Sequence, residues 1–376
     1  MKKVLAFVLS LAMVFALVAC GSGNNTTTNN NGGTTNNGGA ATDDGSASGD
    51  GLNIAVLYYN YSDAFISNVR NEMDAKWEEL GITFNNQDGN TNAGTQLDQV
   101  NTAIANGVNA LVVNAVEASA DETTQAIVDA AKNANIPVVF FNREVSNDVI
   151  NSYDKAAFVG TDPAEAGHMQ GELIGNYLLE NYDAVDLNGD GVISYVMFKG
   201  QENNPEAEYR TQYSVEDANK ILEENGKPAL AYYDSAAATQ YLVDPNGSWS
   251  AAAAQDYMTT ILSAYSEANG NMVELVIANN DDMGLGAITA LETAGYNNGT
   301  GTTIPVFTVD GLQGIVDAIS AGKATGAVGQ SASGLAESVA TLVKNYQADG
   351  ALMSNTGDMI VDSGVAKIRV PYTTVS

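Results

Sequence analysis

The sequence is poor in cysteine, histidine and basic residues. Cys20 is the only cysteine among 376 residues, so no disulfide can form within the chain. His168 is the only histidine, and we expect it at a surface or partly buried position on a helix, without a functional role. Only 15 Lys and Arg stand against 45 Asp and Glu, a formal net charge of −30. Nucleic acid needs a Lys- and Arg-rich surface for its phosphates, so this charge argues against nucleic acid as a partner.

The one long apolar run, residues 4–18, follows two lysines at the N-terminus. It is short for a membrane span and fits the apolar region of a signal peptide. It ends in Leu17-Val-Ala-Cys20 followed by Gly21, a string that resembles a bacterial lipobox. We therefore predict a lipoprotein signal peptide over residues 1–20, with Cys20 as the lipid-carrying residue.

Residues 21–50 consist mainly of Gly, Asn, Thr, Ser and Ala. Such a composition cannot bury a core, and it predicts a disordered tether. About thirty flexible residues reach roughly 30 Å on average. The prediction is an extracytoplasmic domain held by its lipid to the outer face of the cell membrane.

From Leu52 onward, short apolar runs alternate with amphipathic helices. Repeated strand–helix units predict parallel sheets covered by helices on both faces. The strands are too many for one open sheet of usual size, so we predict an α/β fold with two doubly wound lobes. The predicted strands are 53–58, 82–84, 110–114, 137–142, 157–160, 193–199, 229–233, 275–278, 304–309 and 326–328, and the predicted helices are 63–80, 95–106, 121–133, 163–181, 206–225, 250–265, 281–294, 312–321 and 331–348.

In doubly wound sheets, ligands bind beyond the carboxyl ends of the strands. Carboxylates, amides and a guanidinium follow these predicted ends, together with two aromatic rings. Such groups can bind the hydroxyls of a sugar and cover its apolar faces. Any one polar residue is equally explained as part of a loop or a helix cap, so the argument depends on several of them occurring together. The residues are Asp63, Asn142, Glu206, Arg210, Asn280 and Asp310, with Phe65 and Trp249.

A stretch of hard oxygen ligands lies within residues 186–194. Positions one, three and five of an EF-hand-type loop are Asp186, Asn188 and Asp190, and the sharp turn at position six is Gly191. The backbone carbonyl of Val192 and the hydroxyl of Ser194 suit positions seven and nine. Position twelve is Met197 in a predicted strand, so a bidentate carboxylate must come from elsewhere. The alternative is a loop of Asx turns that uses these side chains for its own backbone bonds.

Eight motifs mark the folded part: Tyr59-Asn-Tyr-Ser-Asp-Ala-Phe65, Pro137-Val-Val-Phe-Phe-Asn-Arg-Glu144, Ser152-Tyr-Asp-Lys155, Val159-Gly-Thr-Asp162, Asp186-Leu-Asn-Gly-Asp-Gly191, Val276-Ile-Ala-Asn-Asn-Asp281, Val306-Phe-Thr-Val-Asp310 and Arg369-Val-Pro-Tyr372. In these motifs the folded part resembles the periplasmic glucose/galactose-binding proteins of sugar ABC transporters. The resemblance implies a type I periplasmic binding protein, with two lobes joined by a hinge of three crossings and closed by the ligand. It implies an N-terminal lobe of residues 51–161 plus about 333–365, and a C-terminal lobe of 162–332 plus about 366–376.

The same resemblance assigns roles to residues. It implies that Phe65 and Trp249 are stacking rings and that Glu274 supplies the bidentate carboxylate of a structural Ca²⁺ site. The residues that it implies bind hydroxyls are Asp63, Asn142, Arg210, Asn280 and Asp310.

Four positions depart from the family's pattern. Asn204 replaces a hydroxyl-binding His, Glu206 replaces a ligand Asp, and Gln330 replaces an Asn near the cleft. We expect these three to bind the sugar and to alter the preference among hydroxyls. Ser194 replaces a longer ligand of the ion.

The expected function is capture of a glucose- or galactose-like hexose and its delivery to an ABC transporter permease, by a monomer that is not an enzyme. The same site also suits the ligand-bound partner of a chemoreceptor or sensor kinase, or binding of a different pentose or hexose. A repressor with this fold would need an N-terminal helix-turn-helix. A glycosidase would need two carboxylates facing one bond, for which Asp63 with Glu206 or Asp310 is the candidate pair.

Overall fold

The structure, a computed structural model, describes residues 51–376. The predicted signal peptide, the lipidation site Cys20 and the tether to residue 50 lie outside the described residues. Two seven-stranded sheets form the described part, each mostly parallel. The prediction of an α/β fold with two parallel-sheet lobes is confirmed.

The first sheet has the strand order β12-β13-β5-β4-β3-β1-β2, and only β12 runs antiparallel to its neighbour. Its inner strands, which are short and parallel, are buried on both faces, as expected when helices cover each side. The strands are β1 (Asn53–Tyr58), β2 (Thr83–Asp88), β3 (Ala110–Val113), β4 (Val138–Phe141), β5 (Ala156–Gly160), β12 (Ile360–Val361) and β13 (Lys367–Arg369); the helices are α1 (Ala64–Glu79), α2 (Ala93–Ala105), α3 (Asp121–Asn133), α4 (Asn147–Asn151) and α10 (Ala332–Asp349).

The second sheet has the order β14-β11-β10-β9-β6-β7, with β8 also paired to β6 and β14 antiparallel to β11. Its strands are β6 (Ser194–Lys199), β7 (Ala231–Tyr232), β8 (Leu242–Val243), β9 (Leu275–Ala278), β10 (Val306–Asp310), β11 (Gly326–Gly329) and β14 (Thr373–Val375); its helices are α5 (Pro163–Val185), α6 (Pro205–Glu224), α7 (Ala251–Leu262), α8 (Asp281–Thr293) and α9 (Gln313–Ser320), with a 3₁₀ turn η1 (Glu267–Asn269).

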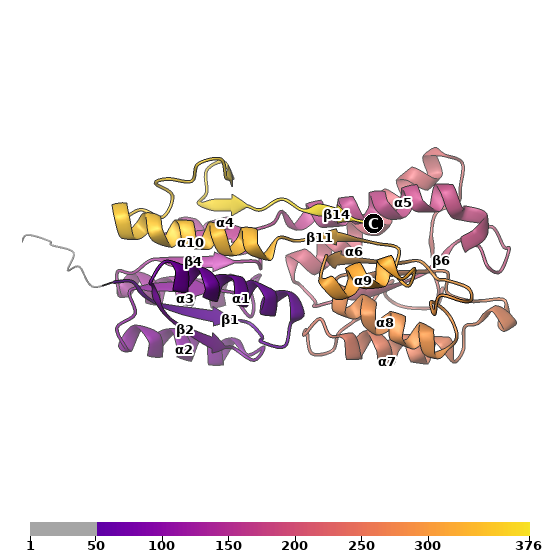
Figure 1. Ribbon diagram of the computed structural model, residues 1–376, viewed down its shortest axis with the longest axis horizontal. Helices are drawn as coiled ribbons and strands as arrows, with labels where there is room; N and C mark the ends of the chain where they lie inside the picture. The colour runs from indigo at the N-terminus through magenta and orange to yellow at the C-terminus, as the bar shows by residue number, and fades with distance from the viewer. Residues whose placement is uncertain (1–50) are drawn as a thin grey trace, which may run out of the picture. The chain divides into compact units, whose positions relative to one another are not determined.

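The chain passes between the sheets after β5, after β11 and after β13. In Figure 1 the last strand, β14, lies beside β11 of the second sheet. β13 pairs with β5 of the first sheet. The boundary between the lobes therefore lies later in the chain than the one predicted near residue 366. Residues 367–369 belong to the N-terminal sheet, and the last crossing follows Arg369.

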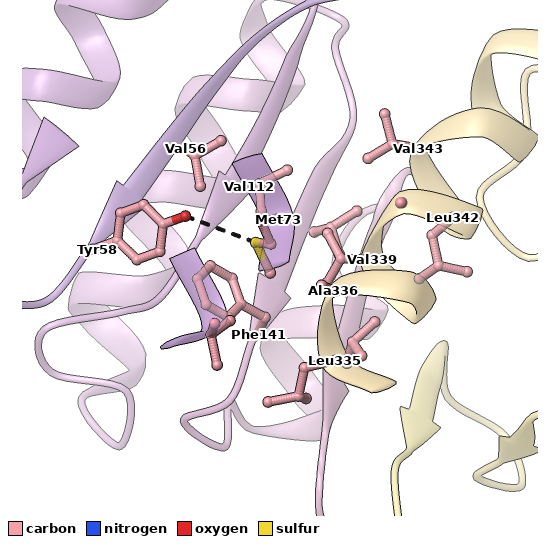
Figure 2. Packing of buried hydrophobic residues seen from close by; sticks show 14 of the residues in the cluster. Val56, Tyr58, Met73, Val112, Phe141, Leu335, Ala336, Val339, Leu342 and Val343 are labelled. Carbon is pink, nitrogen blue, oxygen red and sulfur yellow. Dashed lines mark hydrogen bonds between the residues drawn. The ribbon is translucent and has the colours of Figure 1, made fainter. Parts of the chain in front are cut away.

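The apolar face of α1 explains how the first lobe is held together. Phe65, Ile66, Val69, Met73 and Trp77 recur at helical spacing, and all are buried. They pack with α10 and with inward-facing residues of the central strands in one cluster. Figure 2 shows part of this cluster, in which the Tyr58 hydroxyl lies 3.9 Å from the Met73 sulfur.

Several elements differ from the sequence prediction. β2 continues to Asp88 through polar residues, because an edge strand that pairs only with β1 needs no apolar alternation. α5 continues four residues past the predicted end at residue 181, and Tyr182 and Val185 bury their side chains in the core. Elements of two to five residues, α4, β8, β12, β13 and β14, were not predicted, since such short stretches carry no readable periodicity.

The crossing segments meet at a buried ion network. Lys367 is 1% exposed, and its ammonium donates to the Glu144 carboxylate and to the carbonyl of Val145. Arg369 donates to the other Glu144 oxygen at 2.6 Å and to the Thr161 carbonyl at 2.7 Å. Glu144 therefore joins the segment after β4 to β13.

Candidate functional site

A pocket lies where the carboxyl ends of strands from both sheets face one another. It encloses about 350 Å³ of space not filled by atoms, open solvent included. Both lobes contribute to its wall, which suits a ligand held between them. The lining residues are Tyr59, Asp63, Phe65, Ile66, Asn142, Arg143, Asn204, Glu206, Arg210, Trp249, Asn280, Asp310 and Gln330.

The structure brings all ten residues of the predicted sugar site to this one pocket. Their role in binding is not thereby established and stays a prediction. Tyr59, Ile66 and Arg143 are lining residues that the prediction omitted. Tyr59 directly follows β1 and Arg143 lies two residues after the end of β4, so the rule on strand ends would have nominated them.

Three of the predicted residues also cap helices whose first turns face the pocket. Asp63 accepts from the N–H of Ile66 at the start of α1, and Asn204 accepts from that of Ala207 at the start of α6. Asn280 does the same for α8, and its amide also donates to the Trp249 carbonyl at 3.1 Å. Capping and lining therefore coexist, because each side chain uses only part of its hydrogen-bonding capacity on the backbone.

Arg210 is the central cation of the pocket. Its guanidinium is buried, lies 3.8 Å from the Asp310 carboxylate and donates to the carbonyl of Asn279 at 2.9 Å. It also donates to the Tyr372 hydroxyl at 3.2 Å, on the last crossing between the sheets. The Gln330 amide donates to Asp310 at 2.7 Å. The geometry of the charged group is thus set by partners on several elements.

Three buried polar atoms in this wall have no protein hydrogen-bond partner among the described residues: Glu206 Oε2, Arg210 Nε and Gln330 Oε1. Buried polar groups are nearly always paired. Two acceptors and one donor without partners, all on residues that line one pocket, indicate a ligand or water that supplies both donors and acceptors.

Glu206 also links the two lobes. Its Oε1 accepts from the backbone N–H of Glu144 at 2.8 Å, while Oε2 stays unpaired. Burial raises the pKa of the Glu206 carboxyl, and the nearby Arg210 charge opposes that shift. The side chain that is one methylene longer than the family's Asp therefore reaches across the cleft to the other lobe.

Three residues of the pocket have backbone conformations that side chains rarely adopt. Asn142, Trp249 and Asp310 have φ of 64°, 58° and 131°. Such conformations cost about 1–3 kcal/mol each and cluster at functional sites. The strained backbone therefore carries three side chains that line the pocket: an amide, an aromatic ring and a carboxylate.

Trp249 is held against the backbone of Gly200. A Cβ atom at Gly200 would lie 2.0 Å from the indole ring, so only glycine allows the ring to lie there. The ring is 7% exposed and belongs to the same apolar cluster as Phe65. Two aromatic side chains from different lobes thus contribute to the apolar part of the pocket.

The pocket is rich in carboxyl groups whose pKa is raised. Burial raises the pKa of Asp63, although helix-capping N–H groups oppose the shift. Burial also holds the pKa of Asp310 well above its usual value, with Arg210 opposing and Asp281 adding to the shift. At the pocket's edge, burial and the Asp63 charge raise the pKa of Asp282 from 3.8 to about 6.

A pH dependence of stability follows from Asp282. Because its pKa is higher in the folded than in the unfolded chain, its favourable contribution is full below pH 3.8 and is lost as the pH rises through about 6. We expect this group to favour a rise in melting temperature as the pH falls from 7.5 to 5, and we expect Asp282→Asn to make that rise smaller than in the wild type. Circular dichroism melts at both pH values test this. Equal gains in the variant and the wild type would contradict it.

The loop at residues 186–194 lies away from this pocket, between α5 and β6. Asp186 accepts from the N–H groups of Gly189 and Gly191 at 2.8 and 2.9 Å. Asn188 and Asp190 each accept from an N–H two residues ahead. Gly191 has a φ of 83°. The Asx turns of the alternative interpretation are therefore present.

Glu274, just before β9, lies beside this loop and is completely buried. One carboxylate oxygen accepts from the N–H groups of Leu187 and Asn188, and the other accepts from Ser194. Burial raises the pKa of Glu274, and these donors oppose the shift. The side-chain oxygens of the loop and of Glu274 are of the type, and stand in the order, that a hard cation takes as ligands. Within residues 51–376, however, no group of three or more His, Cys, Asp or Glu side chains is arranged to hold a metal ion.

Two further findings concern the described residues. His168 is 46% exposed, pairs with Asp217 at 2.6 Å and stacks on Tyr213 on the surface of α5 and α6, so the expected surface position is observed. No helix between residues 51 and 376 is long and apolar enough to cross a membrane.

Comparisons with known proteins agree with the fold. Residues 54–351 match the family described as the periplasmic binding protein domain. Over 323 residues the chain is 35% identical to the D-galactose/methyl-galactoside binding periplasmic protein MglB of Haemophilus influenzae, covering 86% of this chain and 88% of that one. A putative rhizopine-binding protein of Rhizobium meliloti is 27% identical, with 84% and 87% covered.

Solved structures show the same fold. A solute binding protein of an ABC transporter from Clostridium phytofermentans with bound β-D-glucose has a TM-score of 0.67 at 21% identity, covering 86% of this chain and 94% of that one. One from Bacillus halodurans with bound myo-inositol has a TM-score of 0.65 at 23% identity, with 87% and 96% covered. The family match over most of the chain and the identity to MglB agree with the two-lobed architecture, and the chain belongs to the periplasmic binding protein family.

Proposed function

We propose that this chain is the sugar-binding component of an ABC transporter, which captures a glucose- or galactose-like hexose between its lobes and delivers it to a permease. The observation that carries the proposal is the set of three unpaired buried polar atoms, Glu206 Oε2, Arg210 Nε and Gln330 Oε1, in one pocket between the lobes. A sugar carries several hydroxyls, each of which donates one hydrogen bond and accepts others, so two of them can satisfy all three atoms.

The rest of the wall supports a neutral polyhydroxyl ligand. Carboxylates such as Asp63 and Asp310 accept from hydroxyls, and Asn142 and Asn280 offer both functions. Phe65 and Trp249 supply apolar surface for the C–H faces of a sugar ring. The galactoside named for the Haemophilus influenzae relative and the glucose in the Clostridium phytofermentans structure belong to this ligand class.

Tryptophan fluorescence tests the proposal. The chain has two tryptophans: Trp249 lines the pocket, while Trp77 is buried in the core of the first lobe. We expect D-glucose or D-galactose to change the emission in a saturable way, and Trp249→Phe to remove that response while calorimetry still detects binding. D-Xylose and D-ribose test the pentose alternative. Absence of binding for all four sugars would reject the proposal.

The glycosidase alternative uses the same carboxylates. Asp63 caps α1, Glu206 bonds the Glu144 backbone, and Asp310 lies beside Arg210, so each carboxylate has a structural partner. We therefore propose binding without catalysis. Release of the leaving group from p-nitrophenyl glucoside or galactoside by the purified protein would contradict this.

Glu206 should influence the choice of sugar. We expect Glu206→Asp to lose the bond to the Glu144 N–H, because the shorter side chain cannot span the cleft, and to change the glucose-to-galactose affinity ratio about tenfold. Calorimetric titrations with both sugars measure the ratio. Glu216→Asp, on the exposed face of the same helix, is the matched control. If Glu206→Asp, alone and together with Asn204→His, leaves the ratio unchanged, the role in specificity is rejected.

We propose that the loop 186–194 binds a structural Ca²⁺. Asp186, Asn188 and Asp190 would supply side-chain oxygens, Val192 a carbonyl and Ser194 a hydroxyl, with the Glu274 carboxylate as the bidentate ligand. The support is the order of the oxygen donors and the buried Glu274 carboxylate beside them. Bound Ca²⁺ would offset the charge of the carboxylates and tie the loop to β9.

Calcium should stabilise the folded chain. We expect 1 mM Ca²⁺ to raise the melting temperature by several degrees over the chelated protein, since an ion that binds only the folded state adds about 2.7 kcal/mol at 100 times its Kd. Glu274→Gln should remove this gain, whereas Glu267→Gln, on the exposed η1 turn, should keep it. Equal melting temperatures with Ca²⁺ and with chelator would reject the site.

Lipidation at Cys20 and membrane anchoring are part of the proposal, supported by the sequence of residues 1–21. Mass spectrometry of the protein from its native membrane would show a lipid-modified N-terminal Cys20. An unmodified N-terminus, or one cleaved elsewhere, would reject the anchor.

A further inference from the structure

A second pocket adjoins the proposed sugar site in the same cleft. Residues 117–120 after β3 and residues 201–204 after β6 line it, so both lobes contribute. The space not filled by atoms is about 690 Å³, open solvent included. Asn204 belongs to the walls of both pockets, which makes them direct neighbours.

One hydrogen bond between the lobes joins the two walls. Arg143 lines the sugar site and Gln201 lines the second pocket, and the Arg143 guanidinium donates to the Gln201 side-chain oxygen. We call this contact the Arg143–Gln201 clasp. Because its two members come from different lobes, the clasp forms when the lobes are closed on each other.

The Arg143 half of the clasp is fixed in place. Its Nη1 donates to the carbonyls of Ala115 and Val116 at 2.9 and 2.5 Å, and its guanidinium lies 4.2 Å from the centre of the Tyr59 ring. The side chain is only 4% exposed. Gln201 is half-buried on a loop. A substitution of Gln201 can therefore open the passage between the two pockets without disturbing the partners of Arg143.

Most residues that line the second pocket have polar side chains. Its exposed side chains include Glu117, Ser119, Glu202 and Asn203, and no aromatic residue lines it. Hydroxyl-bearing groups suit such a wall better than apolar ones, because each hydroxyl can donate to a carboxylate or accept from an amide. A second sugar ring is the ligand chemistry that matches.

We propose that Gln201 sets the size limit of the ligand. The clasp closes the sugar site toward the second pocket, so the protein takes a free monosaccharide and excludes a disaccharide. Without the clasp, the second pocket receives the second sugar ring of a disaccharide whose first ring occupies the sugar site. This inference rests on the proposed function, because it assumes that a hexose occupies the first pocket.

Calorimetric titration of Gln201→Ala and wild type tests the inference. If the wild type binds galactose, the disaccharides are lactose and melibiose; if it binds glucose, they are cellobiose and maltose. We expect the variant to keep its hexose affinity within about threefold and to bind at least one disaccharide tenfold or more tightly than the wild type does. Gln201→Glu, which retains an oxygen acceptor and adds a charge facing Arg143, should exclude the disaccharides at least as strongly as the wild type.

The matched control is Gln212→Ala, because Gln212 is exposed on α6 and its amide bonds Glu216 away from the cleft. It should leave both affinities unchanged. A disaccharide affinity that stays the same in Gln201→Ala, or wild-type binding of a disaccharide as tight as that of its hexose, would overturn the inference while leaving the sugar site in place. Failure of the wild type to bind any hexose would overturn the proposed function itself, so the two failures are distinguishable.

Discussion

Arg210→Met should weaken hexose binding about a hundredfold or more. Arg210 is a buried cation of the pocket, and its Nε has no protein partner within the described part of the chain. A hydrogen bond to a charged group contributes about 1.5–3 kcal/mol, and the substitution also leaves Asp310 buried without its counter-charge. Each 1.4 kcal/mol is a tenfold change in Kd, so the combined loss reaches two orders of magnitude.

Calorimetric titration with glucose and galactose measures this loss, and circular dichroism checks that the variant is folded. Arg70→Met is the matched control, because Arg70 lies on α1 over the Tyr61 ring and is not among the lining residues of the pocket. It should bind as the wild type does. A folded Arg210→Met protein with a Kd within threefold of the wild type would show that the guanidinium does not contact the ligand.

Glu144→Gln should destabilise the fold by about 3 kcal/mol or more. Lys367 is almost completely buried, and Glu144 is the only carboxylate paired with it among residues 51–376. Removing one partner of a buried ion pair costs about 3–5 kcal/mol, because the remaining charge is uncompensated. Arg369 keeps its second partner, Asp362, at 2.7 Å, so the larger cost arises at Lys367.

Urea denaturation followed by circular dichroism measures the free energy of unfolding. The control is Glu79→Gln, which breaks the exposed pair with Lys76 at 3.2 Å and should cost under about 1 kcal/mol. If Glu144→Gln costs no more than Glu79→Gln, the ion network between Glu144 and β13 does not stabilise the fold.

Much of the pocket could be predicted from the sequence, because parallel strands bring their carboxyl ends to one edge. Asn142 follows β4 directly, and Asp310 is the last residue of β10, so locating the strands located these side chains. Lobe architecture followed from the same strand–helix alternation. The predicted helix starts were close at α1, where Asp63 is the N-cap, and at α5, where Pro163 occupies the first turn.

Contacts between distant segments could not be predicted in this way. The bond from the Glu144 N–H to Glu206 joins residues 62 positions apart, and nothing local to either residue indicates it. The strand at Lys367 has no alternation of polar and apolar residues, and its buried charge makes sense only beside Glu144. Arg143 would be assigned to the surface by type, yet it is buried by three partners on the first lobe.

The central claim is that the cleft binds one hexose between the lobes. Isothermal titration calorimetry of the purified protein with D-glucose and D-galactose tests it most directly. The account predicts saturable binding of at least one of them, with one sugar per chain and an affinity that Arg210→Met lowers about a hundredfold. Absence of heat with both sugars, or binding that Arg210→Met does not change, would contradict it.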